Sequence, residues 1–324
     1  MNELNEVKKL LGNDWEQFER FYHTCLQSRV ELLNTVNNYI YNHKGKQLRP
    51  VLALLSAKIF GECTHDVQVA AVAVEMIHSA TLLHDDVVDN SDQRHGVASI
   101  KKMWKSNIAV LCGDYWLSTA FQLLVNNRCD KLFPLLISCM ATMSEGEMWQ
   151  LDKARKLDTT EEDYFSIIGK KTAALLAVSM TVGAMTAGAD DNDSQRIYDI
   201  GYTMGIAFQI RDDIFDYEKN SLAGKPAGND IRERKLTLPL LYALQQADEK
   251  EQKYILKQVE RAKNKSRSVA RVIDFVQQKK GLEYAEKTML QYSEKAKAMM
   301  LALPESTYRE ALIALANFMT TRKK

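Results

Sequence analysis

The segment "VAAVAVEMIHSATLLHDDVVD" (residues 69–89) joins a long apolar run to three acidic residues, Asp85, Asp86 and Asp89. The helical spacing of its apolar residues predicts a largely buried helix over residues 66–90. On that helix Asp85 and Asp89 share one face, about 6 Å apart along the axis. A single DDxxD pattern is common on surfaces, where a solvated helix end explains it. At the end of a buried helix, however, like charges at this spacing repel each other and need cations.

The same pattern occurs a second time in "FQIRDDIFDYE" (residues 208–218), where Asp212, Asp213 and Asp216 end another apolar helix. Two such clusters are much harder to explain as accidents. If the two helices face each other, the carboxylates form opposite walls of one cavity, as in metal sites of helical bundles. Mg²⁺ suits such walls, because it takes one or two carboxylates and completes its shell with water and phosphate oxygens. Neither cluster has the ligand spacing of an EF-hand.

The composition excludes several other classes of protein. With 43 basic and 42 acidic residues the chain lacks the basic excess of a nucleic-acid-binding surface. Its five cysteines are odd in number and contain no CxxC pair, which indicates reduced thiols in a cytoplasmic protein. The polar start "MNELNEVKKLLGNDWEQ" is no signal peptide. The most apolar stretch, 67–83, contains Gln68, Glu75 and His78, which favours a core helix over a membrane anchor.

Helical spacing of apolar residues recurs from end to end, prolines number only five, and strand-like alternation is absent. Gly, Pro, Asn and Asp cluster at the breaks between the helical stretches. No linker or repeat divides the chain, so we predict a single all-α domain over residues 1–324. The helices are predicted over residues 14–42, 49–60, 66–90, 103–126, 130–151, 160–187, 193–219, 237–246, 250–262, 267–299 and 305–321.

Basic residues accompany the acidic clusters. Lys46 and Arg49 lie in "GKQLRP", and Arg94 follows the first cluster. The segments "GKKTAALL" and "GKPAGNDIRERKLTLP" add Lys170, Lys171, Lys225 and Lys235. Each of these residues alone is most simply a surface charge. Beside two clusters of the Mg²⁺ type they indicate a site for a polyanionic phosphate, because Arg offers phosphate a planar fork and Lys a point charge.

In this arrangement the sequence resembles the all-trans polyprenyl diphosphate synthases. The resemblance covers residues 45–239 and a family-like ending, "NFMTTRKK", and no single motif carries it. It implies the all-α helical bundle of the isoprenoid synthases around a central apolar cavity, and a homodimer. The motifs, in order, are "GKQLRP", "EMIHSATLLHDDVVD", Arg94 with Gly96, "LCGD", "SEGEMWQL", "KTAALL", "FQIRDDIFD" and "GKPAGNDIRERKLTLP".

The resemblance also implies a mechanism and roles for residues. Mg²⁺ held by both acidic clusters would bind the diphosphate of an allylic substrate, whose departure leaves an allylic cation. The double bond of isopentenyl diphosphate attacks this cation, and a proton is lost. The family assigns ionisation to the six acids with Arg94, Lys171, Thr172, Gln209 and Lys225, and adds Lys235 for the allylic diphosphate. It assigns isopentenyl diphosphate to Lys46, Arg49, His78 and His95, although a lone histidine on an apolar helix is ordinarily a core residue.

The sequence departs from the family pattern around the isopentenyl subsite and in one later motif. His95 and Gln47 stand where the family commonly has arginine, which removes fixed positive charge. Lys44 and Arg234 stand where it commonly has glycine. Two consequences remain open: Lys44 and its neighbours restore the charge, or isopentenyl diphosphate binds more weakly or with a dependence on pH.

The residues one turn before the first acidic cluster bear on product length. The growing chain is expected to run along this helix away from the metals, past Ala80 and Thr81. Relatives with short products carry bulky aromatics there, whereas both residues are small here. We therefore predict a heptaprenyl to nonaprenyl product, octaprenyl as the central value, for quinone side chains. Met76 and Phe121 are candidates for the floor of the tunnel.

Three alternatives remain. A farnesyl or geranylgeranyl diphosphate synthase would use the same chemistry with a closed tunnel, which the small Ala80 and Thr81 disfavour. A terpene cyclase would ionise the same substrate, but related cyclases replace the second DDxxD and lack the Lys46–Arg49 pair. An inactive partner subunit would lose its acidic clusters, and both clusters are intact in this sequence.

Overall fold

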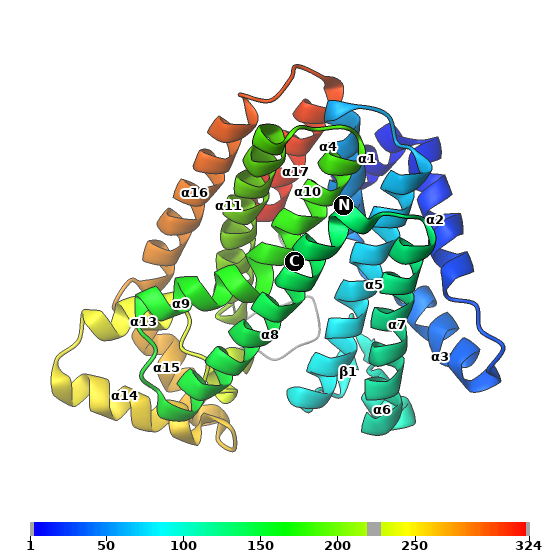
Figure 1. Cartoon of the computed structure of the whole chain (residues 1–324). Coiled ribbons are helices and arrows are strands. Elements are labelled where there is room, and N and C mark those ends of the chain that lie inside the picture. The colour runs from blue at the N-terminus through cyan, green and yellow to red at the C-terminus, as the bar shows by residue number, and fades with distance from the viewer. Residues whose placement is uncertain (1–2, 219–227, 322–324) are drawn as a thin grey trace. The chain divides into compact units, whose positions relative to one another are not determined.

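The computed structural model describes residues 3–218 and 228–321, which are almost wholly helical (Figure 1). This agrees with the predicted all-α class. The first half contains α1 (Glu3–Leu11), α2 (Asn13–Cys25), α3 (Glu31–Asn42), α4 (Leu48–Phe60), α5 (His65–Val88), β1 (Gln93–Arg94), β2 (Val97–Ala98), α6 (Ile100–Trp104), α7 (Ser106–Asn126), η1 (Asp130–Leu132) and α8 (Phe133–Lys156). The second half contains α9 (Glu161–Ile168), η2 (Gly169–Ala173), α10 (Ala174–Thr186), α11 (Asp191–Asp216), α12 (Asn229–Arg232), α13 (Leu238–Gln245), α14 (Glu249–Ala262), α15 (Ser266–Gln278), α16 (Gly281–Met300) and α17 (Thr307–Thr321).

The chain forms two compact units, each built from segments that are separate in sequence. Unit 1 comprises residues 1–137, 178–198 and 301–315, and unit 2 comprises residues 138–177, 199–300 and 316–324. The first acidic cluster therefore belongs to unit 1 and the second to unit 2. A single domain over residues 1–324 stays a prediction.

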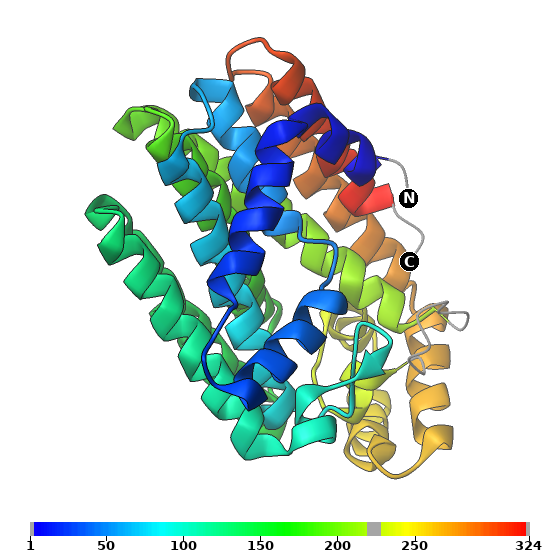
Figure 2. The same ribbon diagram turned by 90° about the vertical axis from the view of Figure 1, so that its right-hand side faces the viewer.

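Helix α5 is the centre of unit 1. Its residues from Val67 to Ile77 are buried without interruption, so that part of the helix is covered on all sides. Helix α7 runs beside it, and α4 packs on another face (Figure 1). The N-terminal helices α1 and α2, dark blue in Figure 2, add contacts to α4 and α5. The segment with which the sequence analysis began is thus the core helix that it predicts.

Unit 2 has a core of its own, in which α14 packs on α15 and α13 on α16. Ile255, Val259, Val272 and Val276 are buried at its centre. The apolar spacing on α14 and α15 explains these helices, since each is amphipathic and buries one stripe. Pro239 lies in the first turn of α13, where its missing N–H costs no hydrogen bond.

Two predicted helices are each two helices in the structure. The helix predicted over residues 14–42 is interrupted between α2 and α3, where Asn34 hydrogen-bonds the backbone of Ser28 and so stabilises a turn. The helix predicted over residues 267–299 ends at α15 and resumes at α16, because Lys280 adopts a left-handed backbone with φ of 59°. Helix α1 and the hairpin of β1 and β2 were not predicted.

The two strands of the hairpin are joined by a tight turn of two residues. Gln93 pairs with Ala98 and Arg94 with Val97. The turn residues, His95 and Gly96, have φ of 50° and 82°, which suits the tight turn that matches strand twist. The hairpin thereby fixes Arg94 immediately beside a turn.

The described chain also contains one wide helical turn, η2, between α9 and α10. It is a π-helix and holds Lys170, Lys171 and Thr172. One extra residue in a turn rotates everything after it by about 100° relative to a regular helix. Nothing in the sequence predicts this turn.

Three stretches, 65–88, 106–126 and 161–186, are long and apolar enough to cross a membrane by length and composition. The apolar window of the first is 72% buried inside the structure, as expected of a core helix, whereas that of α7 is only 33% buried. Helix α7 therefore presents an apolar face that its own chain leaves largely uncovered.

Candidate active site

The first acidic cluster lies at the C-terminal end of α5. Asp85 and Asp86 belong to the last turn, and Asp89 follows as the cap, its N–H donating to the carbonyl of Asp85 at 2.8 Å. Asp85 and Asp89 are half-buried, whereas Asp86 is 2% exposed. A helix C-terminus already carries partial negative charge, so three acids there are doubly unfavourable. The arrangement calls for cations.

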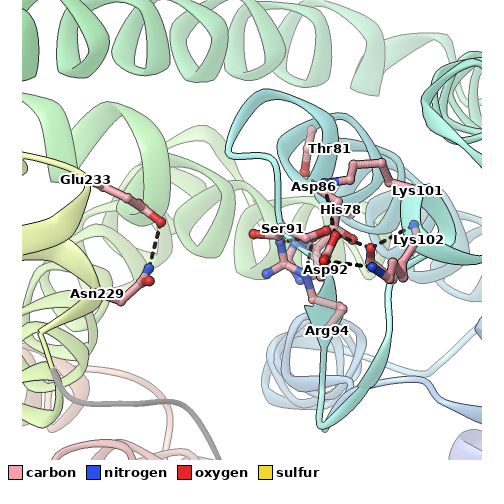
Figure 3. Close-up of polar contacts among 11 residues, drawn as sticks. His78, Thr81, Asp86, Ser91, Asp92, Arg94, Lys101, Lys102, Asn229 and Glu233 are labelled. Carbon is pink, nitrogen blue, oxygen red and sulfur yellow. Dashed lines mark hydrogen bonds and ion pairs between the residues drawn. The ribbon is translucent and has the colours of Figure 1, made fainter. Parts of the chain in front are cut away.

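Arg94 supplies one of these cations from the chain itself (Figure 3). Its Nε and Nη2 donate to Oδ1 of Asp86 at 3.0 and 2.6 Å. Because the Asp86 carboxylate is buried, removal of either partner would leave an uncompensated charge in the protein interior. Asp86 therefore holds Arg94, and its role differs from that of its neighbours Asp85 and Asp89.

The loop that presents Arg94 is fixed by further contacts. The Ser99 hydroxyl donates to the carbonyl of Ser91 at 2.7 Å, and Tyr39 donates to that of Ala98 at 2.8 Å. Asp92 lies between Lys101 and Lys102, at 3.3 and 3.0 Å (Figure 3). Hydrogen bonds from these two lysines lower the pKa of Asp92. The hairpin is thus tied to the start of α6.

Arg49 and His78 meet where α4 packs on α5. Nη1 of Arg49 lies 2.9 Å from Nε2 of His78. Burial, and then the positive charges of Arg49, His95 and Arg94, hold the pKa of His78 well below its usual value. The neutral imidazole accepts a hydrogen bond at Nε2 from the guanidinium, so its proton resides on Nδ1. His78 orients Arg49 instead of adding positive charge.

The other residues assigned to the isopentenyl subsite lie on turns. Lys46 is exposed just before α4. His95 lies against Gly45, and its Nδ1 is 3.2 Å from the carbonyl of His43. Lys44 is paired with Glu19 at 2.6 Å and lies over the ring of Tyr41. Its charge is partly neutralised, which weakens the idea that Lys44 compensates for a missing arginine.

Glu75 is a buried acid that the sequence analysis did not assign. It lies on α5 one turn before His78 and is 4% exposed, and among the described residues its Oε2 has no hydrogen-bond partner. Burial raises the pKa of Glu75 to about 7, and the positive charges of Arg49, Lys8 and Lys44 act against this rise. Glu75 in turn adds to the raised pKa of the buried Tyr22 hydroxyl.

The Glu75 carboxyl makes stability dependent on pH. Its pKa is 4.5 in the unfolded chain and about 7 in the folded one, so between these values only the unfolded chain releases the proton. Stability contributed by the protonated form is therefore complete below pH 4.5 and is lost as pH rises towards 7, by up to about 3 kcal/mol. The variant Glu75→Gln has no such proton, so its free energy of unfolding relative to the wild type should rise between pH 4.5 and 7.5.

Urea unfolding at these two pH values measures the effect. Glu31→Gln, an exposed acid of the same unit, is the control and should show no change with pH. An equal difference between wild type and Glu75→Gln at both pH values would contradict the shifted pKa of Glu75.

The second acidic cluster ends α11 in unit 2. Asp212 and Asp216 are half-buried and Asp213 is 4% exposed. The carboxylate of Asp216 accepts the backbone N–H groups of Asn229 and Asp230, at 2.9 and 3.0 Å, at the start of α12. This acid therefore anchors the segment after the second cluster.

Asp213 accepts hydrogen bonds from two side chains. The hydroxyl of Tyr164 donates to its Oδ2 at 2.6 Å, and Nε2 of Gln209 donates to its Oδ1 at 2.8 Å. Burial raises the pKa of Asp213 to about 7, and these two hydrogen bonds oppose the rise. Thr172 completes the group, since its hydroxyl donates to Oε1 of Gln209 at 2.7 Å.

The π-turn η2 presents Lys171 and Thr172 together. Lys171 forms an ion pair with Glu147 and donates to Oε1 of Gln150 at 2.8 Å, and both partners lie on α8. Gly205 permits α11 to approach η2 closely, because a Cβ on it would lie 2.5 Å from Cα of Ala173. The "SEGEMWQL" motif therefore has a structural role, which is to hold the lysine of the turn.

A cavity of about 100 Å³ in unit 2 gathers most of these groups. Lys235 lines it and forms an ion pair with Glu233 at 2.6 Å. Its neighbour Arg234 has a left-handed backbone with φ of 61°, which explains why the family commonly has glycine there. Lys225 lies outside the described residues. The predicted site residues that line the cavity are Lys171, Thr172, Gln209, Asp213 and Lys235.

The arrangement of the side chains that could donate to a metal ion bears on metal binding. Within residues 3–218 and 228–321, no three acidic, histidine or cysteine side chains come together closely enough to enclose a metal ion. Mg²⁺ would not need such a group, because it usually takes one or two carboxylates and leaves the other positions to water and phosphate. The half-buried Asp85, Asp89, Asp212 and Asp216 are the acids suited to that role.

The residues assigned to the product tunnel belong to unit 1. Ala80 and Met76 are completely buried on α5. Thr81 is half-buried, and its hydroxyl donates to the carbonyl of His78 at 2.8 Å. Phe121 of α7 is half-buried and stacks on Phe133 with ring centroids 6.0 Å apart.

Sequence reasoning missed Tyr164 and Glu75. Tyr164 precedes Thr172 by eight residues, roughly two helical turns, but a single tyrosine on an apolar helix is ordinarily a core residue. Glu75 is a charge inside an apolar stretch. In the sequence alone this charge argues against a membrane span but assigns no function to the residue.

Comparison with known proteins identifies the family of this chain. Residues 30–276 match the polyprenyl synthetase family. The chain belongs to that family. It is 34% identical over 314 residues to an octaprenyl diphosphate synthase from Haemophilus influenzae, covering 97% of this chain and 95% of that protein.

Two solved structures have the same fold. A decaprenyl diphosphate synthase from Rhodobacter capsulatus superposes with a TM-score of 0.92 at 33% identity, covering 98% of both chains. A polyprenyl synthase from Caulobacter crescentus, complexed with calcium and isoprenyl diphosphate, gives the same TM-score and identity, covering 99% of this chain and 98% of that one. The chain therefore has the all-α isoprenoid synthase fold and is a trans-prenyltransferase. Other relatives of similar identity are named for nonaprenyl, heptaprenyl or geranylgeranyl products, so the family leaves the chain length open.

Proposed function

We propose that this protein extends an allylic diphosphate with isopentenyl diphosphate to a long all-trans polyprenyl diphosphate. The product range is heptaprenyl to nonaprenyl, octaprenyl as the central value, and the product serves as a quinone side chain. The observation that carries this proposal is the arrangement of α5, which bears acids at its C-terminal end and two small residues, Ala80 and Thr81, one turn earlier. In this proposal one helix would provide both a metal-binding end and, past its small residues, a path for the growing chain.

Mg²⁺ is the proposed metal, and it would neutralise the charge that develops on the departing pyrophosphate. Asp85 and Asp89 of the first cluster, and Asp212 and Asp216 of the second, are proposed to hold it, because these four acids are half-buried. Arg94 is held beside the first cluster by Asp86 and would bind the same diphosphate. Lys171, Lys225 and Lys235 are proposed to add positive charge to the leaving group.

The isopentenyl subsite is proposed around Arg49. The neutral His78 accepts a hydrogen bond from one arm of the guanidinium and so orients the group towards diphosphate. Lys46 and His95 lie on the adjoining turns and complete this subsite. His95 replaces a permanent charge with one that depends on pH, so we propose that affinity for isopentenyl diphosphate falls as pH rises through the pKa range of histidine.

The reaction itself needs few protein groups. The allylic C–O bond breaks and its electron pair leaves with pyrophosphate. The π electrons of isopentenyl diphosphate then form the new C–C bond, and loss of a proton restores a double bond. Thr172 and Gln209 are proposed to stabilise the cation through their dipoles, and the apolar surroundings exclude water.

Replacing Asp85 or Asp212 by Ala should lower turnover by about 10³-fold or more, because the metal loses a ligand in the transition state. The free energy of unfolding should stay equal or rise by about 0.3–1 kcal/mol, since an acid leaves a helix C-terminus. Incorporation of labelled isopentenyl diphosphate and urea unfolding measure the two effects.

Asp66→Ala and Asp191→Ala are matched controls, because they remove acids from the N-terminal ends of the same two helices. Both controls should keep full turnover. Wild-type turnover in Asp85→Ala or Asp212→Ala would refute the metal assignment.

Product length tests the second half of the proposal. With Mg²⁺, farnesyl diphosphate and labelled isopentenyl diphosphate, the wild-type protein should give a dominant heptaprenyl to nonaprenyl product. Thr81→Phe should give a shorter one, because the bulky ring would obstruct the growing chain. Chromatography of the dephosphorylated products measures both.

Val88→Phe places the same ring on the same helix beyond Asp85 and should leave the product unchanged. A wild-type product that stops at farnesyl or geranylgeranyl would favour a short-chain synthase instead. No incorporation from any primer would favour a cyclase or an inactive partner subunit.

A homodimer is proposed, with α7 in its interface. The apolar window of α7 is only 33% buried, and Leu111 and Val125 are 62% and 56% exposed. Exposed apolar area of this kind is characteristic of protein interfaces. A second copy of the chain is the proposed occupant because homodimers are the commonest soluble oligomers.

Leu111→Glu should halve the mass measured by light scattering, because a charge would be buried against the partner. Leu32→Glu, which changes another exposed leucine (48% exposed, on α3), is the control and should keep the dimeric mass. A monomeric wild-type protein would refute the proposed dimer.

We also propose that the protein acts in the cytoplasm, without a stable membrane anchor and without a nucleic-acid partner. Among the described residues the five cysteines form no disulfide. Burial raises the pKa of Cys25 and Cys112 to about 11, which keeps these thiols protonated and unreactive. Balanced charge supports the absence of a nucleic-acid surface.

A further inference from the structure

A continuous chain of hydrogen bonds in unit 2 runs from Tyr164 to Thr172. The Tyr164 hydroxyl donates to Oδ2 of Asp213 at 2.6 Å. Oδ1 of Asp213 accepts from Nε2 of Gln209 at 2.8 Å, and Oε1 of Gln209 accepts from the Thr172 hydroxyl at 2.7 Å. Tyr164 and Asp213 are 3% and 4% exposed, so water has little access to compete for these bonds.

The carboxylate determines which way the amide of Gln209 faces. A carboxylate only accepts hydrogen bonds, so the NH₂ group of the amide must face Asp213 and its oxygen must face Thr172. With the amide reversed, two oxygens would oppose each other in a buried place, which is strongly unfavourable. The orientation of Gln209 is therefore set by Asp213.

Asp213 is in turn held by Tyr164. A hydroxyl-to-carboxylate bond of 2.6 Å is in the range of strong, charge-assisted hydrogen bonds. Tyr164 is fixed in position because α13 packs on α9 and the ring of Tyr164 meets that of Phe165. The tyrosine thus connects a rigid helix to the one oxygen of Asp213 that Gln209 does not contact.

We propose that Tyr164 is a positioning residue that acts through Asp213 to keep Gln209 oriented towards the reacting carbon, and that Asp213 is an anchor and not a magnesium ligand. This inference rests on the proposed function. It assigns different roles to Asp213 and to Asp212, the half-buried acid that precedes it on α11. Asp213 is 4% exposed and accepts hydrogen bonds from the side chains of Tyr164 and Gln209, whereas Asp212 is half-buried and so more accessible to an ion.

Tyr164→Phe removes one hydroxyl and keeps the ring. Because Gln209 is proposed to act on the transition state, kcat should fall about tenfold while KM for both substrates stays within about twofold. Tyr217→Phe is the matched control: this tyrosine is equally buried, and its hydroxyl lies 3.2 Å from Oγ1 of Thr237, a neutral partner. It should lose similar stability but keep kcat.

A double-mutant cycle shows whether Tyr164 acts through Asp213. The asparagine of Asp213→Asn has one acceptor oxygen and one NH₂ group, so it cannot accept hydrogen bonds from both Tyr164 and Gln209. This variant should therefore also have a lower kcat. The double variant Tyr164→Phe/Asp213→Asn should be no slower than Asp213→Asn alone. Additive losses would overturn the proposed connection, and so would a Tyr164→Phe enzyme that behaves like Tyr217→Phe.

Binding of Mn²⁺ in the presence of inorganic pyrophosphate, followed by electron paramagnetic resonance, tests the metal assignment without turnover. Asp213→Asn should bind Mn²⁺ like the wild type, whereas Asp212→Asn should bind it at least about tenfold more weakly. Equal weakening in both variants would overturn the inference. A wild-type protein without turnover would overturn the proposed function, and the Mn²⁺ comparison would still decide the role of Asp213.

Discussion

Negative charge at the C-terminal ends of two buried helices is the constraint on which the site depends. Helices α5 and α11 both end in DDxxD, where the helix dipole and the neighbouring acids are unfavourable for further negative charge. The protein relieves part of this repulsion internally, through Arg94 at the first cluster and Tyr164 at the second. A cation would relieve the remaining repulsion between the half-buried acids, so the unfavourable state without metal would favour the metal binding that we propose.

Both clusters divide their acids in the same way. In each, the second acid is buried and bonded within its own unit, Asp86 to Arg94 and Asp213 to Tyr164. The geometry of a helix explains this, because the first and fifth positions of DDxxD share a face while the second is turned by about 100°. Three acids that look equivalent in sequence therefore differ in burial: the second acid of each cluster is an anchor inside its own unit, and the half-buried acids are the proposed metal ligands, of which Asp216 also accepts two backbone N–H groups.

The sequence allowed most of the helices and both acidic clusters to be predicted, because apolar spacing and charge are local signals. The interruption between α2 and α3 was missed because a side-chain turn, and not a Gly or Pro, produces it. The π-turn η2 and the hydrogen bond from Tyr164 to Asp213 were missed for another reason: they depend on how helices pack, and the two residues are 49 positions apart. The role that the resemblance assigns to His78 stays a prediction, and the resemblance did not predict its neutral imidazole.

Three of the four departures from the family pattern share a backbone conformation. Gln47, His95 and Arg234 all adopt a left-handed backbone, with φ of 56°, 50° and 61°. A residue with a Cβ costs about 1 kcal/mol or more in that region, so each turn is kept because the surrounding structure requires it. Each of these turns lies next to a basic residue of the proposed diphosphate site. The backbone shape is therefore what the site needs at these positions, and the side chain is free to vary as long as that shape is held. His95 changes the charge of the isopentenyl subsite without changing the hairpin that positions Arg94.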